Sequence, residues 1–118
     1  MCKNLAAKSG ATVVAFDTDS SKARALAPVG VEALASAAAV AARADAIFLC
    51  LPGAPQVHDL CFGVGELIAN MRAGTTLVDM TTATVDVDRE VAAALAAKDV
   101  DFADAPIARG VPSAQDGT

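Results

Sequence analysis

Apolar runs of strand length alternate along this chain with alanine-rich stretches of helical spacing. Strands are expected over residues 11–16, 31–34, 44–51, 75–80 and 100–103, and helices over 1–9, 20–27, 36–43, 55–62, 65–71 and 85–98. Residues 104–118 are expected to form a loop. Residues 12–16 (TVVAF) are nearly all apolar, as expected of a strand buried on both faces, and residues 47–51 (IFLCL) form the strongest strand segment. The alternation predicts an α/β fold in which helices wrap both faces of a parallel sheet.

Composition is consistent with one small domain built on close packing. The chain has 118 residues, of which 54% are hydrophobic but only 3% aromatic, so Ala, Val and Leu must form the core. Nothing in the sequence marks a second domain or a linker, and the length fits one domain. We therefore treat residues 1–118 as a single structural region.

Charge and cysteine content narrow the class of protein further. The net charge is −5 and the basic residues are scattered, which argues against nucleic acid and against an anionic membrane surface as partners. No apolar run approaches the roughly 20 residues of a membrane helix. Cys2, Cys50 and Cys61 are too far apart to suggest zinc, and Cys50 is expected to be a small core residue. No metal is expected, and the compartment is expected to be the cytoplasm, or the mitochondrial matrix in a eukaryote.

The order of the elements is unusual at its beginning. Parallel sheets that bind nucleotides normally open with a strand and a glycine-rich loop that leads into the first helix. Here the first helix precedes the first strand, and these 118 residues contain no such strand or loop. The absent strand would be central, so two open edges are expected. These edges would close on each other, pair with another chain or leave the domain unstable.

Asp17 is the first candidate binding residue, because it ends the first expected strand. An acidic residue there can accept hydrogen bonds from ribose hydroxyls and repel a 2′-phosphate, which favours NAD over NADP. The alternative is that Asp17 only caps the helix beginning near Ser20. Asp19 and Ser21 are equally credible caps.

Two further candidates follow the carboxyl ends of strands, where open parallel sheets bind ligands. Leu51-Pro52 follows the strongest strand, and Thr81-Thr82 follows the next strong one. A threonine hydroxyl there could contact a ribose or a carboxamide. Capping of the helix at 85–98 is the alternative role for Thr81, Thr82 or Thr84.

Arg109 lies in the segment after the last strand and could bind a carboxylate through its planar guanidinium group. A solvated loop arginine is the equally weighted alternative. His58, the single histidine, lies on a short amphipathic helix, and a structural role is favoured over a catalytic one.

Taken together, three segments resemble the 3-hydroxyisobutyrate dehydrogenase, or β-hydroxyacid dehydrogenase, family. They are 44–52 (ADAIFLCLP), 77–82 (LVDMTT) and 104–107 (DAPI) with Gly110 and Gly117-Thr118. The family resemblance implies a Rossmann-like domain that binds NAD or NADP, followed by a helical domain. It implies cofactor contacts at Asp17, Leu51, Pro52, Gln56 and Thr82, and substrate contacts at Ala108, Arg109 and Gly110.

Three departures from the family pattern affect the expected activity. The glycine-rich loop would precede Met1, and the family's catalytic lysine would lie beyond Thr118, so no lysine here receives that role. The family's Ser-Gly-Gly is replaced by Ala108-Arg109-Gly110, which puts the usual substrate in doubt and admits another acid. We expect a partial dinucleotide-binding domain that is inactive by itself and binds NAD more weakly than about 10 μM. The alternative is a non-catalytic module for binding or assembly.

Overall fold

The computed structural model describes residues 1–117; Thr118 of the Gly117-Thr118 pair lies outside the described residues. The chain divides into two compact units, which are described separately. The first comprises residues 1–36 and 108–117, and the second comprises Ala37–Ile107. The expected α/β fold with parallel strands, of Rossmann type, is confirmed.

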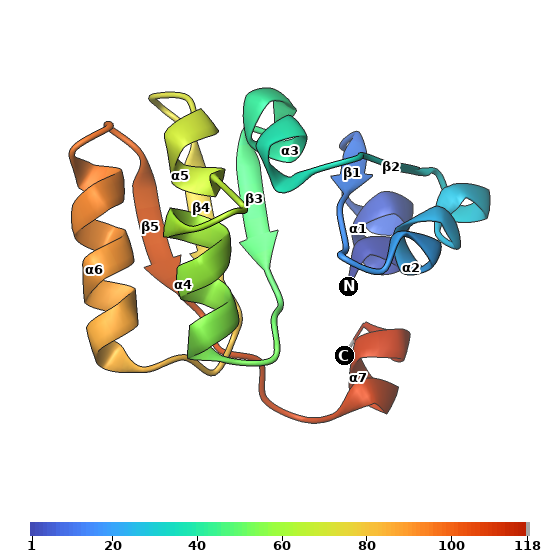
Figure 1. Ribbon diagram of the computed structural model, residues 1–118. Helices are drawn as coiled ribbons and strands as arrows, with labels where there is room; N and C mark the ends of the chain where they lie inside the picture. The colour runs from blue at the N-terminus through green and yellow to red at the C-terminus, as the bar shows by residue number, and fades with distance from the viewer. Residues whose placement is uncertain (118) are drawn as a thin grey trace. The chain divides into compact units, whose positions relative to one another are not determined.

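The first unit contains two short parallel strands and their helices (Figure 1). Its elements are α1 (Cys2–Lys8), β1 (Val13–Ala15), α2 (Ser20–Arg24), a 3₁₀ turn (Ala27–Val29), β2 (Val31–Ala33) and α7 (Val111–Asp116). β1 pairs with β2, with Val13 opposite Val31. The Asn4 side chain of α1 donates a hydrogen bond of 2.8 Å to the Ala114 carbonyl of α7.

Helix α7 lies where a loop was expected, so that prediction was wrong. Both ends of α7 have residues that commonly begin or end a helix. Pro112 lies in the first turn, and Gly117 follows the last residue in the left-handed conformation at φ 73°. The six helical residues are too few to show an apolar periodicity, which is why the pattern predicted a loop.

The second unit is a three-stranded parallel sheet in the order β3-β4-β5. Its elements are α3 (Ala37–Arg43), β3 (Ala46–Leu49), α4 (Ala54–Phe62), α5 (Leu67–Asn70), β4 (Thr76–Asp79), α6 (Val85–Ala96) and β5 (Asp101–Asp104). Leu49, Asp79 and Asp104 are in register. The carboxyl ends of the three strands therefore lie side by side.

The core of the second unit lies between its sheet and helices α4, α5 and α6 (Figure 1). Its fully buried apolar side chains are Val57, Leu67, Leu77, Val91 and Leu95. Ile47 and Leu49 of β3 are buried, but Ala46 is exposed and Phe48 keeps 42% of its surface exposed. The core assignment of Cys50 was wrong, because Cys50 is exposed. In the first unit, β1 is only half-buried, so the expectation that residues 12–16 are buried on both faces was wrong as well.

The strands form two sheets rather than one. Within residues 1–117 no ladder joins β1 to β3, so the first of the three expected outcomes, closure of these two edges on each other, does not occur. In the described part of the chain, β1 pairs with β2 alone and β3 pairs with β4 alone, so each of these two strands keeps one edge without a strand partner.

Candidate functional site

Asp17 follows β1 and closes a tight turn. Its Oδ1 accepts a hydrogen bond of 2.8 Å from the Asp19 backbone N–H. Asp19 is the residue that caps α2, since its Oδ1 accepts from the Ser21 hydroxyl at 2.6 Å and from the Ser21 N–H at 3.1 Å. These two hydrogen bonds, the side-chain one above all, lower the pKa of Asp19. Asp17 is thus not the helix cap.

Asp17 also lines a hollow of about 260 Å³ in the first unit. The hollow is bordered by the loop after β1, the start and end of α2, and the segment after β2; its lining residues are Phe16, Asp17, Thr18, Ser20, Ala23, Arg24, Ala33, Leu34 and Ala35. Arg24 was not singled out from the sequence, because nothing there showed that the last turn of α2 folds over the Asp17 loop. The hollow therefore carries one acidic and one basic side chain.

In the second unit, the loops after β3 and β4 are joined directly. The Leu51 N–H donates a hydrogen bond of 3.0 Å to the Thr81 hydroxyl oxygen. Thr81 is buried, whereas Pro52 and Thr82 are exposed beside this junction, and Gln56 is exposed in the first turn of α4. The structure thus brings Leu51, Pro52 and Thr82 together, with Gln56 close behind in the chain.

The alternative role for the threonines, capping of α6, applies only to Thr84 and only by its position. Thr84 is the N-cap residue of α6, but its side chain makes no capping hydrogen bond. Thr81 uses its hydroxyl to hold Leu51, and Thr82 remains exposed. The sequence missed Asp79, whose side chain is completely buried and accepts a 2.8 Å hydrogen bond from the Thr81 N–H. An acidic residue inside an apolar strand was the available signal.

The predicted substrate residues lie in the first unit, immediately before α7. Ala108, Arg109 and Gly110 are all exposed, and Gly110 is the N-cap residue of α7. Arg109 adopts a left-handed backbone conformation at φ 71°, which glycine tolerates and other residues disfavour. Asp17 occurs in the same unit, whereas Leu51, Pro52, Gln56 and Thr82 belong to the second.

His58 and Lys98 have structural partners. The His58 Nε2 lies 3.4 Å from a Glu90 carboxylate oxygen, and its ring packs 5.1 Å from that of Phe62. Lys98 donates hydrogen bonds to the carbonyls of Ile68 and Ala69 at the end of α5, at 2.6 and 2.9 Å. Both contacts are consistent with structural roles, as the sequence favoured for His58.

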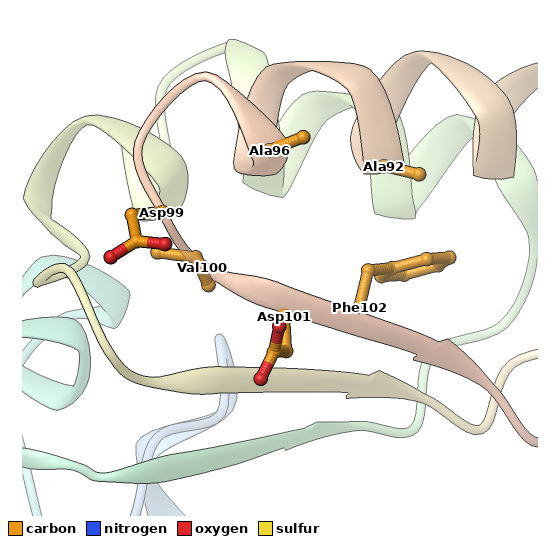
Figure 2. Close-up of a pocket in the computed structure, with 6 residues that line it drawn as sticks. All are labelled: Ala92, Ala96, Asp99, Val100, Asp101 and Phe102. Atoms are coloured by element: carbon orange, nitrogen blue, oxygen red, sulfur yellow. The ribbon is translucent and has the colours of Figure 1, made fainter.

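A larger hollow, of about 400 Å³, lies under α6 beside the amino end of β5 (Figure 2). Ala92, Ala96, Val100 and Phe102 give it apolar walls, with Asp99 and Asp101 at its margin. It is away from the carboxyl ends of the strands, where parallel sheets bind ligands. Its size therefore does not make it the candidate site. No cluster of metal-binding side chains, and no helix able to cross a membrane, occurs within residues 1–117.

Comparison with known proteins identifies relatives along the whole chain. Residues 1–118 match the model for the NAD binding domain of 6-phosphogluconate dehydrogenase. The 2-(hydroxymethyl)glutarate dehydrogenase of Eubacterium barkeri is 35% identical over 111 residues, which are 94% of this chain and 37% of that protein.

Solved structures agree in fold. The 3-hydroxyisobutyrate dehydrogenase of Mycobacterium tuberculosis, solved with L-serine, matches 99% of this chain and 39% of its own with a TM-score of 0.87 at 28% identity. Psf3, solved with NADP⁺ and 2-OPP, matches 98% and 41% with a TM-score of 0.87 at 26% identity. The chain thus spans about two fifths of the length of these relatives.

Proposed function

Because the chain belongs to the β-hydroxyacid dehydrogenase family, that of 3-hydroxyisobutyrate dehydrogenase, we propose that its NAD-binding domain serves hydride transfer. The reaction would run between NAD and a small β-hydroxy acid or its semialdehyde. The observation that carries this proposal is the junction of two exposed loops at the carboxyl ends of β3 and β4, fixed by the Leu51–Thr81 hydrogen bond. When bound, the nicotinamide would accept or donate the hydride.

The proposed cofactor contacts form two groups, one for the adenosine ribose and one for the rest of the dinucleotide. Asp17 would accept hydrogen bonds from the adenosine ribose, since its Oδ2 has no protein hydrogen-bond partner within residues 1–117. Leu51, Pro52, Gln56 and Thr82 would contact the rest of the dinucleotide at the strand ends. Pro52 and Thr82 are exposed in the loops after β3 and β4, Gln56 is exposed at the start of α4 and Leu51 is half-buried, which supports this assignment.

NAD is proposed over NADP on the charge of Asp17, although Arg24 on the same hollow would favour a 2′-phosphate. We assign the greater weight to Asp17, because it lies only two residues beyond the end of β1, where an acidic residue can contact the ribose. Fluorescence titration with NADH and NADPH tests the choice. We expect the chain to prefer NADH, and Asp17→Asn to weaken NADH binding about tenfold, since a charge-assisted hydrogen bond is worth about 1.5–3 kcal/mol.

Asp19→Asn is the matched control for that titration. It removes a carboxylate two residues away, and asparagine also caps helices well. We expect it to leave the ratio of NADH to NADPH affinities unchanged. Equal affinities for the two cofactors in the wild-type chain, or a preference for NADPH, would contradict the assignment of Asp17.

Affinity and turnover of the 118-residue chain are expected to be low. Backbone N–H groups of a glycine-rich loop normally hold the pyrophosphate, and these residues include no such loop. A dissociation constant for NAD above about 10 μM is expected, or a binding free energy weaker than roughly −7 kcal/mol. Calorimetry that gives tighter binding, or absorbance that shows NADH formation from 3-hydroxyisobutyrate, would contradict this expectation.

The proposed substrate is a small carboxylic acid received at Ala108, Arg109 and Gly110. The support is that Arg109 is exposed and presents a fork of donors that suits a carboxylate. A cation there extends the range of acids toward dicarboxylates.

The three free cysteines are consistent with a reducing compartment, and we assign the cytoplasm, or the mitochondrial matrix in a eukaryote.

A role in assembly is the second candidate. Within residues 1–117, every strand except β4 pairs on one side only, and open strand edges can pair with another chain. Light scattering across a concentration series would detect a homo-oligomer. A monomer at all concentrations would exclude the assembly role, and cofactor binding would be the one remaining proposal.

A further inference from the structure

A buried carboxylate stands at the centre of the loops that follow the three strands of the second unit. Asp79 ends β4, and its side chain has no solvent exposure. Its Oδ1 accepts a hydrogen bond of 2.8 Å from the Thr81 N–H. This bond turns the chain directly after the strand and fixes the direction in which Thr81 and Thr82 leave the sheet.

Thr81 extends the connection to the neighbouring loop. The last backbone hydrogen bond between β3 and β4 runs from the Met80 N–H to the Leu49 carbonyl at 2.9 Å. Beyond it, the Thr81 hydroxyl oxygen accepts from the Leu51 N–H at 3.0 Å. A side chain therefore takes the place of the next backbone acceptor after the strands have ended. Only 3% of Thr81 is exposed, so water does not compete for this bond.

The other side of the same turn is held by the backbone. The Ala105 N–H donates to the Asp79 carbonyl at 2.8 Å, and the Ile107 N–H donates to the Met80 carbonyl at 3.3 Å. The segment from Asp79 to Thr81 is thus bonded to the loop after β3 on one side and to the loop after β5 on the other. Its conformation sets the distance between the loops.

A buried carboxylate at this junction lowers the stability of the fold, so stability does not explain why Asp79 is there. The second oxygen of Asp79, Oδ2, is buried and has no hydrogen-bond partner within residues 1–117. Burying an ionisable group with one oxygen unpaired costs free energy that an apolar side chain would not cost. A carboxylate is needed here only if its one hydrogen bond, to the Thr81 N–H, has a geometric purpose.

We propose that Asp79 and Thr81 are positioning residues for the cofactor site, a proposal that rests on the function proposed above. Neither is expected to contact the cofactor, because both are buried. Asp79 holds the Thr81 backbone, and the Thr81 hydroxyl holds Leu51. Together they fix Leu51-Pro52 against the exposed Thr82, so that the two loops form one prearranged surface.

The test compares four variants of the 118-residue chain. Thr81→Val keeps the shape but removes the acceptor, and Thr81→Ser restores a hydroxyl. Asp79→Asn keeps an acceptor for the Thr81 N–H without the charge. Thr84→Val is the matched control, because it removes a threonine hydroxyl from the same loop that makes no capping hydrogen bond.

Two readouts are measured for each variant: hydrogen exchange of the Leu51 amide by NMR, and NADH binding by fluorescence. We expect Thr81→Val to speed Leu51 exchange and to weaken NADH binding, each about tenfold, the equivalent of about 1.4 kcal/mol. Thr81→Ser should restore both quantities to within about twofold of wild type, and Thr84→Val should change neither. Asp79→Asn should shift both less than Thr81→Val, and it tests the junction if the valine variant does not fold.

The outcomes separate the two proposals. If Thr81→Val speeds Leu51 exchange but leaves NADH affinity unchanged, the junction is structural and the positioning role is wrong. If the serine variant fails to restore binding, the hydroxyl is not the operative group and the role is again wrong. If the wild-type chain binds no NADH at millimolar concentration while its Leu51 amide is protected, the proposed function fails and the hydrogen-bonded junction itself stands.

Discussion

At the scale of single residues, the three cysteines occupy different environments. Cys50 is exposed just beyond β3, Cys61 is buried in α4 and Cys2 is half-buried in α1. Burial, and secondarily the charge of Asp79, raises the pKa of the Cys61 thiol to about 12. The three cysteines should therefore react with disulfide reagents at different rates, because the thiolate is the reacting form.

Thiol titration of the native chain should show Cys50 reacting far faster than Cys61. The raised pKa alone reduces the Cys61 thiolate about a thousandfold below that of an ordinary cysteine. Cys50→Ser should remove the fast phase, and unfolding in urea should expose Cys61. A single rate for all three thiols in the native chain would contradict these environments.

Backbone strain at Arg109 gives a second prediction at this scale. The left-handed conformation of Arg109 lowers the stability of the folded chain by about 1–2 kcal/mol, because Arg109 is not a glycine. Replacement by glycine removes this strain, but the extra freedom of glycine in the unfolded chain takes back roughly 0.5–1 kcal/mol. Arg109→Gly should therefore stabilise the chain by up to about 1 kcal/mol, measured by urea unfolding, while weakening the binding of carboxylic acids. Arg109→Ala keeps the strained conformation, so equal stabilisation by both variants would count against strain as the cause.

At the scale of elements, helix α6 begins with two aspartates in different surroundings. Asp86 is exposed, whereas Asp88 has one fully buried oxygen without a partner although the side chain as a whole is half-exposed. Burial first, and then the charges of Asp104 and Asp79, raise the pKa of Asp88 above its usual 3.8. The native state therefore binds a proton at Asp88 more tightly than the unfolded chain does.

The sign of the resulting pH dependence follows by linkage. The contribution of Asp88 to stability is fully present below pH 3.8 and is lost as the pH rises through the raised native pKa. Asp88→Asn should raise the urea midpoint at pH 7 and leave it nearly unchanged below pH 3.8. Asp86→Asn, the control, removes a charge that the helix dipole favours and should not stabilise. Stabilisation by Asp88→Asn that is equal at both pH values would contradict this account.

Elements were predictable from the sequence where periodicity decided them. Val91 and Leu95 were expected to face inward and are fully buried, while Arg89 and Glu90 are exposed. The predictions that were wrong concern residues whose burial depends on neighbours that are close in space but distant in sequence. Cys50 lies inside the continuous apolar run 47–51, yet it stands beyond the last paired residue, Leu49, and hence outside the packed part of the strand. No local pattern marks where a strand loses its partner.

The candidate site was predictable only in part for the same reason. The ends of the strands indicated Leu51 and Thr82, because ligands of parallel sheets bind there. The different roles of Thr81 and Thr82 depend on which side chain reaches the loop after β3, and the capping of α2 by Asp19 depends on the turn that Asp17 closes. Asp79 and Arg24 acquire their importance only from contacts distant in sequence.

At the scale of the whole molecule, the deepest burial is confined to the second unit. The largest fully buried side chains, Leu67, Leu77 and Leu95 among them, all belong to it, whereas α1 contains no buried residue and β1 is only half-buried. Local stability follows buried apolar contact, so the two units should open separately.

Hydrogen exchange followed by mass spectrometry should resolve this difference. Amides of β4 are expected to exchange slowest, and those of β1 about tenfold faster or more. Leu77→Ala should abolish much of the protection in the second unit, because removing a fully buried leucine costs about 2–5 kcal/mol. Uniform exchange across both units would show instead that the chain unfolds in one step.

The strand order of the second unit also bears on how the protein is made. β3, β4 and β5 stand in the sheet in the order in which they occur along the chain, and each joins its neighbour through one helix-containing connection. Closing such short connections costs little entropy, so each new strand can pair with the one before it as soon as it is synthesised. During translation the sheet can grow by one strand at a time on the emerging chain, with β3 never left waiting for a distant partner.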